Sequence, residues 1–600
     1  MHDDGTTTFR VWAPDADRVE LLLGGRREPL APGERGWWSV RTGASAGTRY
    51  ALAVDGGEPR PDPASRRQPE GVHGPSELVD LGALPWSPEE ATWRPAPLAG
   101  AVLYELHVGA FTEEGTLDAA TAHLGDLAEL GVTHVEVMPI APFNGERGWG
   151  YDGVAWYAVH EAYGGPAAFA RFVDACHRHG LAVVLDVVYN HFGPSGNYLP
   201  EFGPYLTDRY DTPWGQALNL DGPGSDEVRA LIVGNALHWL GDYHVDGLRL
   251  DAVHGLIDTS TVHVLSQLSD AVADLATRVR RPLQLIAETD RQDPQTIRPR
   301  AAGGQGIDAQ WHDELHHGLH VALTGESDGY YVDYRGLPEV AACYERGFVF
   351  DGRYSRNRGR TVGAPLGELS SHRLVACLQN HDQVGNRALG DRLTTIVDAD
   401  RLRAAIALLV ASPETPMLFM GEEYGETRPF CYVTSHPEPE LAEAVREGRR
   451  AEFAAFVDFT GEVPDPQDPA TFAAAKLDRR AADTPEGEAR RATWSDLLAL
   501  RRAQPALSSG RRDLCEVLAV DEERFAAVRR HPAGADVVIL ANLCEESWAL
   551  ALPDPGPWEV AMSTDESRYG GAGRPVALAD GQATVPPRSA CLLIADEAGA

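Results

Sequence analysis

Hydrophobic and polar positions along the 600-residue chain follow three successive patterns. Up to about residue 90, short runs such as TTTFRVWAP and RYALAVDG alternate hydrophobic with polar residues between Gly, Pro and Asp turns, which is typical of β-strands. From residue 101, hydrophobic strands alternate with helical stretches, and after residue 506 the strand pattern returns. This order predicts an amino-terminal β-sandwich (residues 1–92), a central α/β domain (residues 93–505) and a carboxyl-terminal β-sandwich (residues 506–600).

The central region contains eight candidate strands, with helices predicted between most of them. Repeated βα units require a parallel sheet that is buried on both faces. Eight such units favour a closed (β/α)8 TIM barrel with insertions over an open doubly wound sheet. No GxGxxG motif follows the first strand, which weakens the dinucleotide-binding alternative. The eight segments are AVLYELHV, THVEVMP, LAVVLDVV, VDGLRL, PLQLIAE, GIDAQW, RLVACLQ and ETPMLFM.

Acidic residues stand at or just after the ends of four of these strands. Asp186 lies at the end of the third strand and Asp251 ends the fourth. Glu288 ends the fifth, and Asp382 follows the seventh by a short loop. Any one of them taken alone is as readily explained as a helix N-cap. Because the chemistry of a (β/α)8 barrel sits at the carboxyl ends of its strands, four acids on one rim indicate an active site.

The segment HVDGLRLDAVH places Arg249 and Asp251 on one face of its strand, opposite Leu248 and Leu250. In a barrel this face points into the mouth, where an arginine favours the ionised form of a neighbouring carboxylate. Two carboxyl groups across a glycosidic bond can hydrolyse it, and a retaining enzyme holds them about 5–5.5 Å apart as nucleophile and acid/base. The acid/base must stay protonated near neutral pH, which requires burial or a nearby like charge.

Four segments in this region resemble, in residue identity and in order, the signature segments of the α-amylase superfamily of glycoside hydrolases. The resemblance implies that Asp251 is the nucleophile, Glu288 the acid/base and Asp382 a stabiliser of the transition state. Asp186 is then expected to orient Arg249 rather than to react. The four segments are DVVYNH (186–191), GLRLDAVH (247–254), AETD (287–290) and QNHDQ (379–383).

The same resemblance implies a set of residues that bind the attacked sugar. Arg249, His191 and His381 would support the subsite that holds this sugar, and Tyr151 in RGWGYDG would stack on its ring. Core packing explains most aromatic residues in any protein. Weaker candidates for further sugar platforms are Trp149 and Trp214.

The stretch WHDELHHGLH has two interpretations. The resemblance implies that Trp311, Asp313 and Glu314 line the leaving side of the cleft. The alternative is a zinc site, because histidines spaced i, i+4 share one helix face. The order of residues matches neither H-E-x-x-H nor H-x-x-E-H, and no Asp/Asn-rich loop indicates calcium, so we predict no metal and no cofactor. The histidines in question are His312, His316 and His320.

Longer stretches outside the four segments resemble most the trehalose-releasing members of the superfamily. Examples are YELHVGAFTEEGTL, GWGYDGVAWYAVHEAYGGP and FGPYLTDRYDTPWGQALNLDG. The resemblance implies hydrolysis of the α-1,4 bond next to the terminal trehalose of maltooligosyltrehalose, an α-glucan, with release of trehalose and a maltooligosaccharide. Three alternatives stay open: a 1,4-α-glucan branching enzyme, an α-1,6 debranching hydrolase, and a non-catalytic glucan-binding protein.

Composition narrows the partners and the compartment. The formal net charge of -36 disfavours binding to nucleic acid or to anionic membranes, and no apolar run is long enough to span a bilayer. Seven scattered cysteines without a CxxC pair, and a start without a secretory signal pattern, predict a cytoplasmic protein with reduced thiols. We expect a monomer or homodimer whose partner is its glucan substrate.

Overall fold

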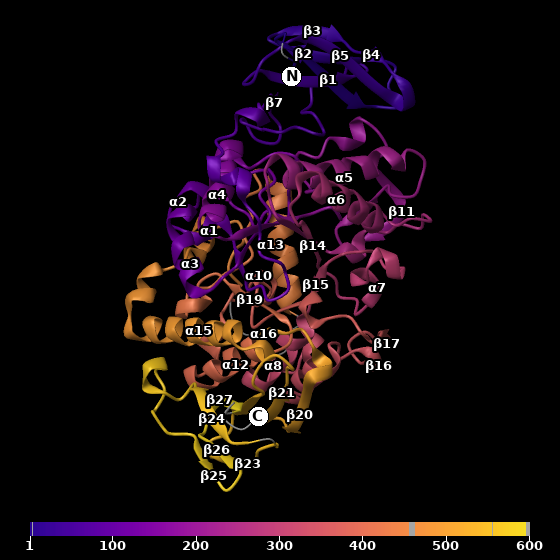
Figure 1. Cartoon of the computed structure of the whole chain (residues 1–600). Coiled ribbons are helices and arrows are strands. Elements are labelled where there is room, and N and C mark those ends of the chain that lie inside the picture. Colours follow the sequence, from indigo (N-terminus) through magenta and orange to yellow (C-terminus); the bar gives the residue numbers. More distant parts are fainter. Residues whose placement is uncertain (3, 455–462, 555, 596–600) are drawn as a thin grey trace.

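The computed structural model describes residues 1–2, 4–454, 463–554 and 556–595 of the chain. Its centre is a closed barrel of eight strands, in the order β8-β9-β10-β13-β14-β15-β18-β19 (Figure 1), and neighbouring strands run parallel. Each strand lies within one of the eight predicted segments, so the predicted (β/α)8 class is confirmed. The bounds are β8 Leu103–Leu106, β9 His134–Val137, β10 Ala182–Val187, β13 Gly247–Leu250, β14 Gln284–Ala287, β15 Ala309–Trp311, β18 Leu374–Cys377 and β19 Thr415–Phe419.

The barrel strands are short, and every residue in them is buried. This follows from their position, because side chains fill the interior of the barrel and helices cover its outside. The short helices are α1 Val108–Phe111, α2 Leu117–Ala120, α3 Leu124–Leu130, α7 Pro294–Ile297, α10 His381–Gly385, α11 Leu393–Ile396, α14 Pro469–Ala475 and α16 Pro505–Ser508.

The long connecting helices pack their hydrophobic faces against the barrel. In α4 (Gly165–Arg178), Ala168, Phe172 and Cys176 recur four residues apart on the buried face. Pro166 occupies the first turn, where a missing N–H group costs nothing. The other long helices are α5 Ser225–Asp242, α6 Val264–Val279, α8 Asp313–Thr324, α9 Leu337–Arg346, α12 Ala399–Ala411, α13 Pro439–Ala454 and α15 Pro485–Ala503.

Sheets lie at both ends of the molecule in Figure 1. The amino-terminal sheets are β1-β5-β4 and β3-β2-β6-β7, and the carboxyl-terminal sheets are β20-β21-β22-β27-β24 and β23-β26-β25. The flanking β regions are therefore present, while the predicted boundaries after residues 92 and 505 stay predictions. Strand bounds are β1 Thr6–Trp12, β2 Val19–Leu23, β3 Arg26–Pro29, β4 Ala31–Pro32, β5 Trp37–Gly43, β6 Arg49–Val54, β7 Ser76–Glu77, β20 Cys515–Val520, β21 Arg524–Arg529, β22 Val537–Asn542, β23 Trp548–Ala551, β24 Trp558–Ser563, β25 Ala577–Ala579, β26 Gln582–Val585 and β27 Ser589–Ala595.

Ion pairs and a core contact join the flanking sheets to the barrel domain. Arg35, beside β5, contacts Asp226 (2.7 Å) and Glu227 (3.1 Å) in the first turn of α5. At the other end, buried Arg529 of β21 donates to the carbonyl oxygen of Ala411 (2.8 Å), the last residue of α12.

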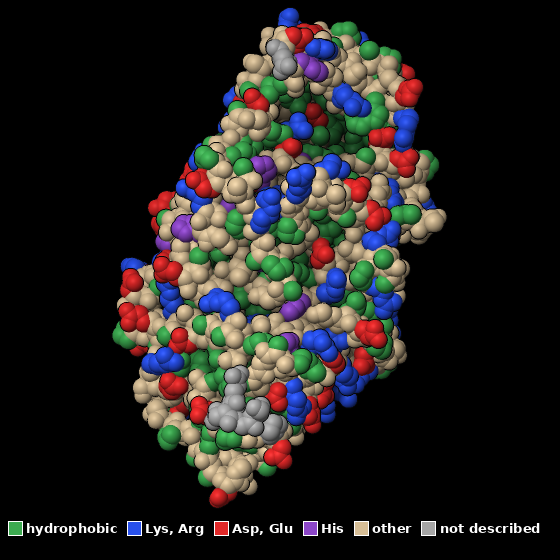
Figure 2. Space-filling model, in the orientation of Figure 1, with side chains coloured by type: hydrophobic (Ala, Val, Ile, Leu, Met, Phe, Trp, Pro, Cys, Tyr) green, Lys and Arg blue, Asp and Glu red, His purple; other side chains and the backbone are tan. Residues whose placement is uncertain are grey.

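Acidic and basic side chains are interspersed over the face in Figure 2. None of the described helices combines the length and the hydropathy needed to cross a membrane.

Candidate active site

A buried arginine joins three of the four predicted acidic residues at the carboxyl ends of the strands. Arg249 Nη1 donates to both oxygens of Asp186 (3.0 and 2.9 Å) and to Asp251 Oδ1 (2.6 Å). Its Nη2 lies 3.9 Å from Glu288 Oε2. The parallel register of β10 and β13 sets Asp186 beside Arg249. One guanidinium group thus contacts three acids that are far apart along the chain.

The turn after β13 fixes the two carboxylates relative to each other. Ala252 has φ 39° and ψ 52°, a left-handed conformation that costs a non-glycine residue about 1–3 kcal/mol. Its N–H group donates to Glu288 Oε2 (2.5 Å). Asn190 Nδ2 donates to Asp251 Oδ2 (2.6 Å) and to the Asp251 carbonyl oxygen (2.9 Å). Asn190 lies in one of the signature segments but is not among the predicted site residues.

Tyr151 comes from the loop after β9 and lies against the same acids. Its hydroxyl donates to Asp186 Oδ2 (2.6 Å), and its ring stacks on His381 with centroids 5.1 Å apart. Gly150 has φ +100°, and a Cβ there would lie 2.2 Å from the Pro139 carbonyl oxygen. Only glycine permits this close approach, which brings the tyrosine to the barrel mouth.

His191 and Trp214 form a stacked pair near Tyr151. His191 Nε2 lies 3.0 Å from the Tyr151 carbonyl oxygen, and its ring is nearly parallel to that of Trp214 (5.6 Å, 8°). Trp214 is 41% exposed on the β11–β12 hairpin (Leu206–Thr212 and Gly215–Leu218), so it presents a ring to solvent. Trp149 is 5% exposed and donates from Nε1 to the Cys431 carbonyl oxygen (3.1 Å), so it packs within the wall.

Asp382 lies in the first turn of α10, directly after β18. Its side chain is 41% exposed, and Oδ1 lies 3.5 Å from His381 Nε2. Asn380 caps this helix by accepting the N–H group of Gln383 (2.9 Å). The cap holds Asp382 at the rim, facing the cleft next to the cluster around Arg249.

A cavity of about 490 Å³ opens beside Asp382. Trp311 lines it and packs its ring against the Arg249 guanidinium group (4.1 Å). Asp313 and His317, one turn apart on α8, also line it. The volume lies within the range of small-molecule sites, about 300–1,000 Å³. All three predicted leaving-side residues, Trp311, Asp313 and Glu314, therefore line this cavity.

Glu314, the third of these residues, is 1% exposed. Its carboxylate accepts the backbone N–H groups of Val349 (2.8 Å) and Phe350 (3.0 Å), and Oε2 lies 3.1 Å from His312 Nε2. Both carboxylate oxygens therefore have partners within the protein. The backbone that they bind, at Val349 and Phe350, leads directly into the β16–β17 hairpin (Asp351–Ser355 and Arg360–Gly363) at the cavity wall. Glu314 therefore supports the wall of the cavity.

The three histidines of the zinc alternative have separate protein partners. His312 Nδ1 lies 2.9 Å from Glu414, His316 Nδ1 lies 2.5 Å from the Leu378 carbonyl oxygen, and His320 Nε2 lies 2.7 Å from Glu326. Within the described ranges, His312, Cys343 and Glu414 are the group whose ligand atoms lie within 4.8 Å of one another. Burial raises the pKa of the Cys343 thiol well above its usual value, so it favours the thiol over the metal-binding thiolate.

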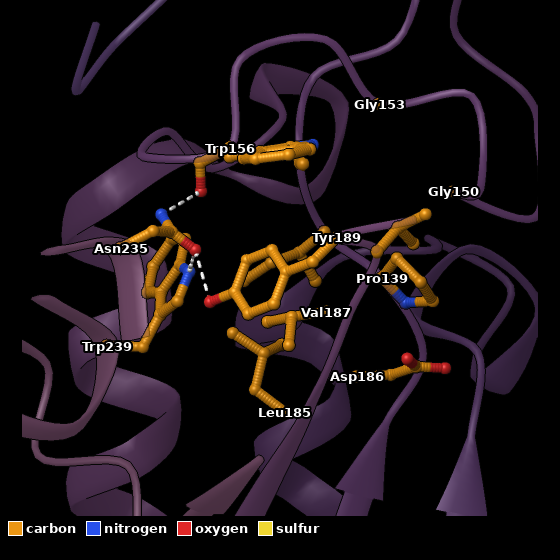
Figure 3. Close-up of a pocket in the computed structure, with 13 residues that line it drawn as sticks. Pro139, Gly150, Gly153, Trp156, Leu185, Asp186, Val187, Tyr189, Asn235 and Trp239 are labelled. Carbon is orange, nitrogen blue, oxygen red and sulfur yellow. Dashed lines mark hydrogen bonds between the residues drawn. The ribbon is translucent and has the colours of Figure 1, made fainter. Parts of the chain in front are cut away.

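A small interior cavity of about 20 Å³ lies behind the site (Figure 3). Asn235 Oδ1 accepts from Tyr189 Oη (2.7 Å) and Trp239 Nε1 (3.1 Å), and its amide donates to the Trp156 carbonyl oxygen (2.8 Å). The Asp186 carboxylate points away from this cluster. The space holds no more than a water molecule, so the cluster supports the loop after β10 and binds no substrate.

Burial sets the protonation of Glu288, the predicted acid/base. It raises the pKa of Glu288 to about 8, with the carboxylates of Asp251, Asp382 and Asp313 adding to the effect and Arg249 opposing it. A carboxyl group with this pKa is protonated at neutral pH and can donate a proton. The site therefore holds a half-buried carboxyl group that can donate a proton, beside a carboxylate paired with arginine, and hydrolysis of a glycoside requires such an arrangement.

Comparisons with known proteins agree with this chemistry. Residues 89–209 match the family model described as "Alpha amylase, catalytic domain". A malto-oligosyltrehalose trehalohydrolase from Arthrobacter ramosus is 49% identical and covers 94% of this chain and 97% of its own. One from Rhizobium sp. (strain M-11) is 45% identical and covers 98% of both chains. A solved structure from Salmonella typhimurium, which carries a provisional α-amylase name, is 39% identical with a TM-score of 0.89 and covers 98% of both chains.

An acid-rimmed (β/α)8 barrel with this catalytic-domain match defines a glycoside hydrolase of the α-amylase superfamily. The likeness to curated relatives extends well beyond the barrel, over nearly the full length of both chains. The chain belongs to the malto-oligosyltrehalose trehalohydrolase family.

Proposed function

We propose that the protein hydrolyses the α-1,4 bond next to the terminal trehalose of maltooligosyltrehalose, releasing trehalose and a shortened maltooligosaccharide. The relatives from Arthrobacter ramosus and Rhizobium carry the name of this activity. The observation that carries the proposal is the contact of Arg249 with Asp251 (2.6 Å) and its approach to Glu288 (3.9 Å) beside a cavity of about 490 Å³. A proton donor, a nucleophile and room for a leaving disaccharide are then side by side.

The proposed reaction has two steps and retains the anomeric configuration. Glu288 protonates the glycosidic oxygen while Asp251 attacks C1, so the C1–oxygen bond breaks, trehalose leaves and a glycosyl-enzyme ester forms. Glu288, now ionised, takes a proton from water, and the resulting hydroxide displaces Asp251 from C1. Asp382 stabilises the transition state from the rim. Arg249 orients Asp251 in both steps and is held in turn by Asp186.

The binding roles divide between the two sides of the scissile bond. On the side of the attacked sugar, Tyr151 offers a stacking ring, and the imidazoles of His191 and His381 reach the sugar hydroxyls. On the leaving side, Trp311 and Asp313 contact the trehalose unit, and burial together with the nearby Asp382 carboxylate raises the pKa of Asp313 to about 6. We propose that Glu314 acts on the same side by holding the wall of the cavity.

Product analysis on three substrates separates this function from its rivals. We expect trehalose and maltotriose from maltotriosyltrehalose, with slow hydrolysis of maltopentaose and of pullulan. A branching enzyme would transfer glucan segments and release little trehalose, and a debranching hydrolase would cut the α-1,6 bonds of pullulan first. A glucan-binding protein would bind maltotriosyltrehalose tightly and hydrolyse none of the three. Any of these last three results would contradict the proposal.

The pH dependence of kcat/KM should follow the proton on Glu288. Its pKa in the folded protein is raised to about 8, so the proton donor is present below this pH and is lost as the pH rises through it. We expect kcat/KM on maltotriosyltrehalose to fall about tenfold per pH unit above pH 8. Initial rates at subsaturating substrate between pH 5 and 10 measure this limb, and a plateau that continues to pH 10 would exclude Glu288 as the acid.

A further inference from the structure

Glu105 lies inside the barrel at the mouth, and the proposed reaction gives it no role. It belongs to β8, its side chain is 1% exposed, and it contacts His381, 276 residues further along the chain. Oε1 lies 2.5 Å from His381 Nδ1, and Oε2 accepts the backbone N–H group of His381 (2.9 Å). A carboxylate that binds both the ring and the backbone of one residue fixes the plane of that ring.

The other ring nitrogen of His381 also faces a carboxylate, since Nε2 lies 3.5 Å from Asp382 Oδ1. A neutral imidazole has one N–H group and one lone pair. If its proton sits on Nδ1, toward Glu105, the Nε2 lone pair points at the negative charge of Asp382. Two carboxylates on opposite edges of the ring are satisfied together only when both nitrogens carry protons.

We propose that Glu105 is a positioning residue that keeps His381 doubly protonated, so that its Nε2–H group is a fixed donor toward the attacked sugar and Asp382. This inference rests on the proposed placement of His381 against that sugar. Glu105 itself touches no substrate and acts through the histidine. The pair of Glu105 and His381 is neutral as a whole, so it supplies a hydrogen-bond donor without adding net charge to the cleft.

The surrounding charges favour the same protonation state. Burial opposes the charged ring, but the carboxylates of Asp382 and Glu105 outweigh it and raise the pKa of His381 to about 9, against the further opposition of Arg249. The ring therefore carries its second proton throughout the neutral range. Seven titratable groups face the His381 ring. They are Glu105 of β8, His107 just before α1, Glu136 of β9, Tyr151, Asp186 of β10, Arg249 of β13 and Asp382 of α10.

Glu136 provides a matched control on the next strand. It is the register partner of Glu105 and is likewise 1% exposed. Neither of its carboxyl oxygens has a hydrogen-bond partner among the described residues. Burial, and after it the charge of Glu105, raises the pKa of Glu136 well above the usual value. Glu136 is thus a neutral acid, and its replacement by glutamine changes neither charge nor shape.

The experiment compares pH profiles of kcat/KM on maltotriosyltrehalose for the wild-type protein, Glu105→Gln and Glu136→Gln. Without the Glu105 charge, only Asp382 is left to oppose burial and Arg249 at His381, and the pKa of the ring falls toward its ordinary value of about 6.5. We expect Glu105→Gln to stay within about threefold of wild type at pH 5.5 and to lose at least about tenfold at pH 7.5. Glu136→Gln is expected to overlay the wild-type profile.

A Glu105→Gln profile that runs parallel to wild type, with one uniform loss at every pH, would mean a structural role and overturn the inference. So would an equal shift of the basic limb in Glu136→Gln. If Glu105→Gln does not fold, Glu105→Asp carries the test, because the retained charge should leave the limb near pH 8 at a lower rate, and a limb below pH 7 contradicts the inference. Trehalose release by the wild-type protein in the same assay checks the proposed function separately.

Discussion

Asp251→Asn is expected to lower kcat on maltotriosyltrehalose by roughly 10⁴-fold or more, the scale on which enzymes lose rate when a nucleophile is removed. The amide is almost the same size as the carboxylate and can still accept the hydrogen bond from Arg249 Nη1, now 2.6 Å from Asp251 Oδ1. What it cannot do is form a stable ester with C1. The loss should therefore appear in kcat, with substrate binding largely retained.

Two measurements complete this test. Thermal unfolding should show Asp251→Asn folded, with a midpoint close to that of wild type, because the packing at the site is unchanged. Asp270→Asn is the matched control. It makes the same chemical change on α6, where the exposed Asp270 side chain pairs with Arg300 (3.0 Å). Exposed pairs of this kind add little to stability, and activity should stay within about twofold. An Asp251→Asn protein with near-normal kcat would refute the nucleophile.

Glu288→Gln is expected to lower kcat/KM on maltotriosyltrehalose by roughly 10²–10⁴-fold, the usual contribution of general acid catalysis. The loss should depend on the leaving group. Fluoride leaves without protonation, so the first step on an α-maltosyl fluoride should be nearly unaffected. The second step needs a base to activate water, and azide needs none, so sodium azide should restore turnover and yield an α-glycosyl azide.

The pH profile of Glu288→Gln provides an independent check. The pKa of Glu288 is raised to about 8 in the folded protein, and the basic limb that it produces in wild type should be absent from the variant. Equal losses on the natural substrate and on the fluoride, with no rescue by azide, would assign the proton transfer to another residue. Rates on both substrates, with and without azide, distinguish these outcomes.

The barrel and the convergence of the acids could be predicted because their signals are local. Each barrel strand is a short apolar run, and the acids stand at or beside the strand ends, as Asp251 does after β13. The flanking sheets follow from the same alternating pattern. The domain boundaries, the cytoplasmic location and the monomeric or homodimeric state stay predictions from the sequence.

Contacts between distant segments could not be predicted in this way. In the sequence, Glu105 is a single polar residue in an apolar strand, and its partner His381 lies 276 positions away. The direction of a side chain at a strand or helix end is equally hard to foresee. Glu314 follows Asp313 on α8 but turns inward to the N–H groups of Val349 and Phe350.

We propose that Asp251 and Glu288 act across one bond, the bond that holds the terminal trehalose. The test follows maltotriosyltrehalose hydrolysis with ¹H NMR during the first minutes, before the new reducing end mutarotates. We predict that trehalose and the α-anomer of maltotriose appear together at equal rates, as a retaining mechanism at that bond requires. First appearance of the β-anomer, or maltotriose formed without trehalose, would contradict this mechanism.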